Sequence, residues 1–183
     1  MGIVDDKYQK LSDIEHVLAR PGMYIGSVKG HTEEILDKDK FIFQEITYNP
    51  GFLKLFDEII SNSVDEYKRN PKLNKIGVEV TKDKITITDN GGIPVKIHDK
   101  YDEWIPEMIF SNLKAGSNFD DTENRTVVGT NGVGSTLTNI FSLEFTISTC
   151  DGKKKFEQTF TKNMSKRTTP KITNGKTGHT TIS

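Results

Sequence analysis

Four polar side chains that could handle a water molecule and a divalent cation recur along one predicted helix. They are spaced at i, i+4, i+7 and i+11 within Phe52–Arg69, on one face roughly opposite the apolar residues: Glu58, Asn62, Asp65 and Arg69. An amide oxygen suits Mg²⁺, and a carboxylate one turn away can deprotonate a water. Asn62 is also a poor residue for a helix interior, which favours a specific role. A solvated helix face with a favourable charge ladder would show the same stripe.

A second polar motif, Asp89-Asn90-Gly91-Gly92-Ile93-Pro94, follows the predicted strand Lys84–Thr88. An acid at a strand end before two glycines can point into a cleft while the backbone turns away. From there, Asp89 could accept a hydrogen bond from an exocyclic amine, which would distinguish adenine from guanine. A plain turn built from favourable turn residues is the alternative.

A third motif is a glycine loop, Gly129-Thr130-Asn131-Gly132-Val133-Gly134, placed before a helix predicted to begin near Ser135. Its glycines leave backbone N–H groups accessible, and the positive end of the helix favours anions, so the loop could cradle a phosphate. The spacing matches neither the P-loop nor the dinucleotide fingerprint. A simple loop leading into a helix is the alternative.

The elements that must position these motifs follow from apolar periodicity. We predict helices over Ser12–Ala19 (Ser12 as cap, Glu15 completing a capping box), Phe52–Arg69, Ile105–Lys114 and from near Ser135. Alternation predicts strands around 76–80, 85–88, 143–147, 156–160 and 180–183, with a hairpin turn at 81–84. The remainder of the first 50 residues is predicted to be irregular. Strands and helices intermixed with hairpins favour an α+β fold, one mixed sheet with helices on one face.

Composition narrows the class of protein. The 183 residues suffice for one domain, and 25 Lys and Arg against 26 Asp and Glu argue against a nucleic-acid grip in this segment. A single cysteine, Cys150, excludes an intrachain disulfide and favours a reducing compartment. Without a signal peptide or an apolar run of ~20 residues, we expect a soluble intracellular protein. Because the chain stops within a predicted strand, we also expect it to be part of something longer.

Taken together and in this order, the three motifs resemble the GHKL ATPases, a family that includes type II topoisomerases, MutL, Hsp-type chaperones and histidine kinases. Within that family the chain is most similar to the type IIA DNA topoisomerases, in the form found in eukaryotes, large viruses and phages rather than in gyrase. This similarity rests on five segments, residues 20–27 (RPGMYIGS), 56–66 (FDEIISNSVDE), 105–110 (IPEMIF), 131–134 (NGVG) and 137–142 (LTNIFS).

The resemblance implies a two-layer GHKL (Bergerat) sandwich, with a mostly antiparallel sheet, over residues 1–183, of which 1–50 would form an N-terminal arm. It implies that Glu58 is the general base, that Asn62 binds Mg²⁺, that Asp65 supports the site and that Arg69 approaches the phosphates. Asp89, with Gly91, Gly92 and Ile93 beside it, would bind adenine above Thr180. Ser117 and Asn118 would contact ribose and phosphates. The residues that would wrap the triphosphate are Asn131, Gly132, Val133, Gly134 and Ser135.

The resemblance further implies ATP and Mg²⁺ as cofactors, dimerisation on ATP binding, and DNA held by other domains of a parent enzyme. A lysine of the following transducer domain would complete the site, so these residues alone would hydrolyse ATP slowly or not at all. Two departures stand out. The Asp89–Pro94 loop is one residue shorter than the usual family motif, and Thr130 and Thr136 stand where eukaryotic relatives tend to carry Arg and Lys. A chaperone-like or MutL-like module and a histidine-kinase catalytic domain are the alternatives.

Overall fold

A computed structural model of the chain describes residues 8–115 and 132–183. By their internal contacts the residues group into two compact units, Met1–Leu53 and Lys54–Ser183. Each unit is described by itself below.

The first unit begins with helix α1 (Asp13–Ala19), and the predicted capping box is confirmed. The backbone N–H of Glu15 donates to the Ser12 hydroxyl, and the Glu15 carboxylate accepts from the Ser12 backbone N–H at 2.8 Å. This reciprocal pair satisfies two backbone donors that an α-helix leaves open at its start. A short 3₁₀ turn, η2 (Pro21–Met23), follows directly.

The prediction of irregular structure for the rest of the first 50 residues was wrong. Strands β1 (His31–Asp37) and β2 (Ile42–Tyr48) form an antiparallel hairpin in which Leu36 lies opposite Phe43. Both of these side chains are exposed, as are most others on both faces of the hairpin. Because neither face is buried, the sequence lacks the alternation of apolar and polar residues by which strands are recognised.

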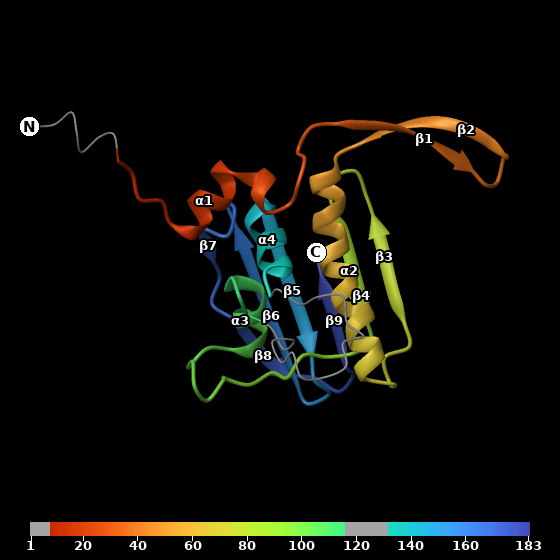
Figure 1. Cartoon of the computed structure of the whole chain (residues 1–183). Helices are drawn as coiled ribbons and strands as arrows, with labels where there is room; N and C mark the ends of the chain where they lie inside the picture. Colours follow the sequence, from red (N-terminus) through yellow and green to blue (C-terminus); the bar gives the residue numbers. More distant parts are fainter. Residues whose placement is uncertain (1–7, 116–131) are drawn as a thin grey trace, which may run out of the picture. The chain divides into compact units, whose positions relative to one another are not determined.

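The second unit is an antiparallel sheet with helices on one face, which confirms the predicted α+β fold (Figure 1). Its strand order is β3-β4-β9-β5-β6-β7, and β8 also pairs with β6. The strands are β3 (Ile76–Val80), β4 (Ile85–Asp89), β5 (Glu144–Cys150), β6 (Lys154–Thr161), β7 (Lys166–Arg167), β8 (Lys171–Asn174) and β9 (His179–Ile182). The helices are α2 (Pro50–Arg69), α3 (Ile105–Ser111) and α4 (Gly134–Phe141).

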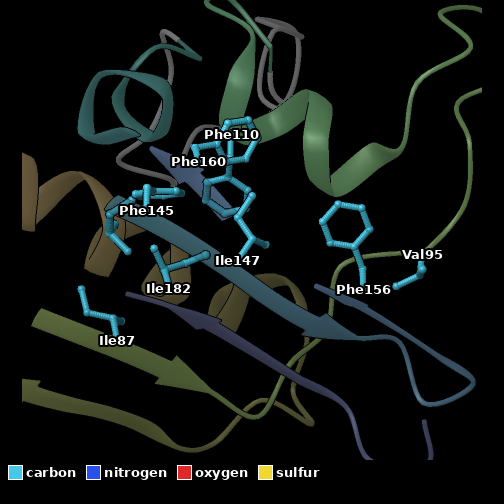
Figure 2. Close-up of a cluster of buried hydrophobic side chains, with 9 residues drawn as sticks. Ile87, Val95, Phe110, Phe145, Ile147, Phe156, Phe160 and Ile182 are labelled. Carbon is cyan, nitrogen blue, oxygen red and sulfur yellow. The ribbon is translucent and has the colours of Figure 1, made fainter. Parts of the chain in front are cut away.

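The core lies between the sheet and the helices, as Figure 2 shows. Alternate residues of β4, β5, β6 and β9 point to the helices, and Ile147 and Phe156 are completely buried. Phe110 of α3 packs on Phe145 with ring centroids 5.8 Å apart. In these strands, the apolar residues of the predicted period-two alternation are therefore the ones that face the core.

Two predictions about the helices need correction. The apolar stripe of α2 was expected to be its buried face, but Val64 and Tyr67 are 38% and 54% exposed. Asp65, expected on the opposite face, is 1% exposed, and the buried side of the helix includes Ile59 and Ser63. The reason is that this side meets polar groups of the sheet as well as the core. Helix α3 ends at Ser111, three residues before the predicted end.

Candidate functional site

Helix α2 brings Glu58 against the start of helix α4. A Cβ atom added to Gly134 would overlap the Glu58 carboxylate, so glycine at that position leaves the space that the Glu58 side chain occupies. The side chain of Glu58 is 23% exposed, and its Oε1 accepts an ion-paired hydrogen bond from Lys54 Nζ at 2.6 Å. One carboxylate oxygen is thus held by a cation one turn earlier, while the other lies at the glycine loop.

One turn further along α2, Asn62 makes a second contact with α4. Its Nδ2 donates a hydrogen bond to Ser135 Oγ at 2.8 Å, and its side chain is exposed. Since the amide nitrogen is engaged with Ser135, the amide oxygen is the atom left to meet a ligand. Gly132, with a positive φ of 60°, and Val133 precede this point in the glycine loop. The structure therefore brings Glu58, Asn62, Gly134 and Ser135 together, as the sequence predicted.

Asp89 lies at the end of β4 and is almost fully buried, with 6% of its surface exposed. Its Oδ2 accepts from the Ser63 hydroxyl at 2.7 Å, and its Oδ1 accepts from the Gly91 backbone N–H at 2.9 Å. Each carboxylate oxygen has further lone pairs, so the group can accept another donor without losing these two. Ser63 follows Asn62 directly on α2, so this helix contacts both the start of α4, through Asn62, and Asp89, through Ser63.

The loop after Asp89 lies flush against the end of β5. A Cβ atom on Gly92 would overlap the Cys150 carbonyl oxygen, and the Ile93 backbone N–H donates to Thr149 Oγ1 at 3.0 Å. Thr149 also lies 3.1 Å, hydroxyl to hydroxyl, from Thr180, the residue of β9 that pairs with Asp89. The predicted residues Asp89, Gly91, Gly92, Ile93 and Thr180 thus form one cluster.

Asp151 fastens this loop to the β5–β6 turn. Its Oδ2 accepts from the Val95 backbone N–H at 3.1 Å, and its Oδ1 accepts from the backbone N–H groups of Lys153 and Lys154. Burial acts to raise the pKa of this carboxyl, but the three N–H groups, together with the positive charge of Lys153, outweigh burial and hold the pKa below its ordinary value. The ionised form therefore braces the loop.

Two of the remaining predicted residues, Asp65 and Arg69, lie further along α2. Arg69 is 11 residues beyond Glu58, which is about 16 Å along a helix axis, and its guanidinium is paired with Glu66 at 3.4 Å. Asp65 is buried on the same helix. Ser117, Asn118 and Asn131 lie outside the described residues.

Sequence reasoning missed three residues that shape the site, Lys54, Ser63 and Thr149. Lys54 stands four residues before Glu58, a spacing that favours an ion pair on a helix and could have been recognised. Thr149 occupies an inward position of a strand whose other inward residues, Phe145 and Ile147, are apolar, so its polarity was a signal too. Ser63 carried no signal, because its significance depends on where β4 ends.

Chemically, the two clusters are suited to different parts of one elongated ligand. The Glu58 cluster offers a carboxylate, an amide oxygen and the start of a helix, which suit a water, a divalent cation and an anion. The Asp89 cluster offers a buried carboxylate and hydroxyl groups beside a glycine turn, which suit a planar group with an amine. Within the described part of the chain, no three His, Cys, Asp or Glu side chains gather as a metal site.

Comparison with known proteins agrees with this chemistry. No protein-family model matches the chain. The chain is 44% identical to DNA topoisomerase 2 of Arabidopsis thaliana over 93% of its length, and 42% identical to that of Acanthamoeba polyphaga mimivirus over 94%. It superimposes on the crystal structure of the ATPase region of Saccharomyces cerevisiae topoisomerase II with a TM-score of 0.90 at 40% identity, covering 98% of this chain and 50% of that one.

The second unit therefore has a GHKL-type fold, and the agreement in sequence and fold extends over nearly the whole chain. In sequence and fold the chain corresponds to the ATPase region of the type II DNA topoisomerases. It spans only 12% of the length of the Arabidopsis relative. The similarity to eukaryotic and viral enzymes confirms the family assignment made from the motifs, rather than a chaperone-like or MutL-like module.

Proposed function

We propose that the chain binds Mg-ATP between α2, the start of α4 and the ends of β4 and β5. The observation that supports this most is the double contact of α2 with α4, in which Glu58 lies at Gly134 and Asn62 is bonded to Ser135. This contact aligns a carboxylate and an amide with the end of a helix that attracts phosphate.

In this proposal Glu58 is the general base of ATP hydrolysis. Its carboxylate accepts a proton from a water, whose oxygen forms a bond to the γ-phosphorus while the bond from that phosphorus to the bridging oxygen breaks, leaving ADP and phosphate. Lys54 holds Glu58 Oε1, so Oε2, which lies towards Gly134, is the oxygen available to the water.

The chemistry of the donor set also fits Mg²⁺. Asn62 presents one amide oxygen, and Mg²⁺ commonly takes one or two protein oxygens together with water and phosphate oxygens. When bound, the ion would neutralise phosphate charge. Asn62 would hold it through Oδ1, while its Nδ2 remains bonded to Ser135.

Asp89 is the proposed acceptor for the adenine amine. Gly91, Gly92 and Ile93 would line one side of the base, and Thr180 would lie beneath it together with Thr149. The shortened loop is compatible with this role because Gly92 and Ile93 are anchored directly on β5. From the family resemblance, the proposal also includes Ser117, Asn118 and Asn131 as nucleotide contacts, Asp65 as a support and Arg69 near the phosphates.

For the parent enzyme we propose that ATP binding closes a dimer of two copies and drives DNA strand passage inside the cell. The family of the chain supports this, and so does its match to the ATPase and transducer domains of DNA topoisomerase II from Balamuthia mandrillaris, with a TM-score of 0.90 and 49% of that chain covered. Among the described residues, no helix combines the length and apolarity needed to cross a membrane.

A calorimetric titration of the chain with adenylyl imidodiphosphate, with and without Mg²⁺, tests the proposal. We expect one site per chain, with tighter binding when Mg²⁺ is present, and we expect Asn62→Ala to remove most of the effect of Mg²⁺. Asn174→Ala, an exposed amide on β8, is the matched control and should keep that effect. Absence of binding, or binding indifferent to Mg²⁺ in the unmodified chain, would contradict the proposal.

A further inference from the structure

Positive charge is concentrated near the end of the chain. Residues 151–183 contain eight of the 25 Lys and Arg but only two of the 26 Asp and Glu. The nearly neutral total therefore conceals a segment with a formal excess of six positive charges, while the preceding 150 residues carry an excess of seven negative ones. Such asymmetry within one chain favours an anionic partner for the basic part.

The fold places these cations along strand β6 and its neighbours at one edge of the sheet (Figure 1). At one end of β6, Gly175 donates its backbone N–H to the Lys153 carbonyl at 2.9 Å, which brings Lys176 beside the β5–β6 turn. In the strand register, Lys171 of β8 lies opposite Glu157 in the middle of β6, and Lys166 of β7 lies opposite Thr161 at the other end. We call the following set the β6 stripe: Lys153, Lys154, Lys155, Lys162, Lys166, Lys171 and Lys176.

The two acids of this segment are ionised, and the excess of six positive charges already counts them. The hydrogen bond from Lys155 to Glu157, at 2.7 Å, lowers the pKa of that carboxyl, and the nearby positive charge of Lys171 lowers it further. Asp151 accepts hydrogen bonds from three backbone N–H groups, and the positive charge of Lys153 also acts on it. Six of the seven lysines are exposed, and Lys155 is half-buried.

The groups between the lysines identify the kind of anion. Residues 144–183, all of which the structure describes, expose no large apolar side chain. They present hydroxyl and amide groups instead, and pairs such as Thr146 with Thr159 bridge neighbouring strands at 3.1 Å. A membrane-binding surface needs apolar groups to insert, and single-stranded nucleic acid is usually bound by stacking bases on aromatic rings. Lysines mixed with hydroxyls and amides are instead typical of contacts to the phosphates of a duplex.

We propose that the β6 stripe binds the phosphate backbone of duplex DNA without reading its sequence. Eight residues of β6 extend about 25 Å, and a duplex carries one negative charge per roughly 1.7 Å, so several phosphates lie within reach of the stripe. The choice of DNA rests on the proposed function, in which the parent enzyme acts on DNA. In the parent enzyme, the duplex would then contact the surface of this chain as well as other domains.

The test measures binding of the chain to a fluorescein-labelled 20-base-pair duplex by anisotropy, from about 50 to 200 mM salt. Binding should weaken steeply with salt, because each phosphate contact contributes about 0.9 to the slope of log K against log salt. A triple variant, Lys166→Gln, Lys171→Gln and Lys176→Gln, should reduce that slope by about 3. The matched control, Lys75→Gln, Lys82→Gln and Lys84→Gln, makes the same charge change beside β3, at the opposite edge of the sheet, and should leave the slope nearly unchanged.

Two results would overturn the proposal: no measurable duplex binding at 50 mM salt, or an equal loss of slope in both triple variants. The titration with adenylyl imidodiphosphate is repeated on every variant. Unchanged nucleotide binding shows that the variants are folded, and it separates a failure of the β6 stripe from a failure of the proposed ATP site.

Discussion

The two ends of the proposed ATP site are built in different ways. At the Asp89 end the side chains are buried, and both carboxylate oxygens are already bonded, one to Ser63 and one to the backbone of Gly91. At the Glu58 end the side chains are partly exposed, and the Asn62 amide nitrogen donates a hydrogen bond to Ser135. Buried polar groups must find partners when the chain folds, whereas groups that act on a ligand must stay reachable. In this proposal the Asp89 end, which would bind adenine, is preorganised by folding. The Glu58 end, which would bind the phosphates, is completed by the ligand.

The largest expected effect concerns Glu58, at the open end. Glu58→Gln in the full-length enzyme keeps the shape of the side chain but removes its ability to take a proton, so kcat for ATP hydrolysis should fall by about 10²–10⁴. Nucleotide affinity should change little, because in this proposal Glu58 acts on the attacking water rather than on the nucleotide. Steady-state hydrolysis and analogue titration measure the two effects. Asp57→Asn, the exposed neighbour, is the control, and a Glu58→Gln enzyme that retains a tenth of its activity would exclude the general-base role.

The next largest effect concerns Gly92, at the closed end. In Gly92→Ala the new Cβ would overlap the Cys150 carbonyl, a backbone atom that cannot swing aside, so the free energy of unfolding should fall by about 1–3 kcal/mol. Nucleotide affinity should fall as well, because the same loop carries Ile93. Urea denaturation measures the change in stability. In Gly77→Ala the nearest atom would be 3.9 Å away, so this control should be close to neutral. Equal stability of the two variants would show that the loop is not anchored on β5.

The same contrast explains how far sequence reasoning could go. The Glu58 end is local, since helical spacing aligns Glu58 with Asn62 and a glycine loop before a helix is visible in the sequence. The Asp89 end depends on register, because Thr180 reaches Asp89 only through the pairing of β9 with β4. No periodicity within one segment encodes that pairing. The sequence alone could therefore identify most of the groups but not the contacts that hold them.

The fold was predictable for a related reason. Strands β4, β5 and β6 bury one face each, so their alternation is visible, whereas the β1–β2 hairpin buries neither face and was missed. Helix α2 was located almost to its ends, but its buried side was misjudged because Asp65 and Ser63 lie inward. A polar residue on a buried face is invisible to a count of apolar spacing, and such residues gather where the helix meets the site.

A smaller effect is expected from Ser63, which connects α2 with the closed end. Ser63→Ala leaves Asp89 Oδ2 without its hydroxyl partner in a buried place, so stability should fall by about 1 kcal/mol. The preference for ATP over GTP analogues should also weaken, because Asp89 would be free to turn. Paired calorimetric titrations measure that ratio. Ser61→Ala, two residues earlier on the same helix, is the control, and an unchanged ratio would mean that Gly91 alone orients Asp89.

The smallest effect concerns Asp151, which braces the closed end from the β5–β6 turn. Its folded pKa lies below the ordinary value of 3.8, so its contribution to stability is present above that pH and is lost as the pH falls through the folded pKa. Asp151→Asn should therefore be less stable than the unmodified chain at pH 7, and the gap should close as the pH falls below about 4. Urea denaturation across that range measures the gap, with Asp99→Asn, whose side chain is 94% exposed, as the control. A stability difference that is constant with pH would mean that the shape of the Asp151 side chain, rather than its charge, supports the loop. Ionisation of Asp151 would then contribute nothing to the preorganised Asp89 end.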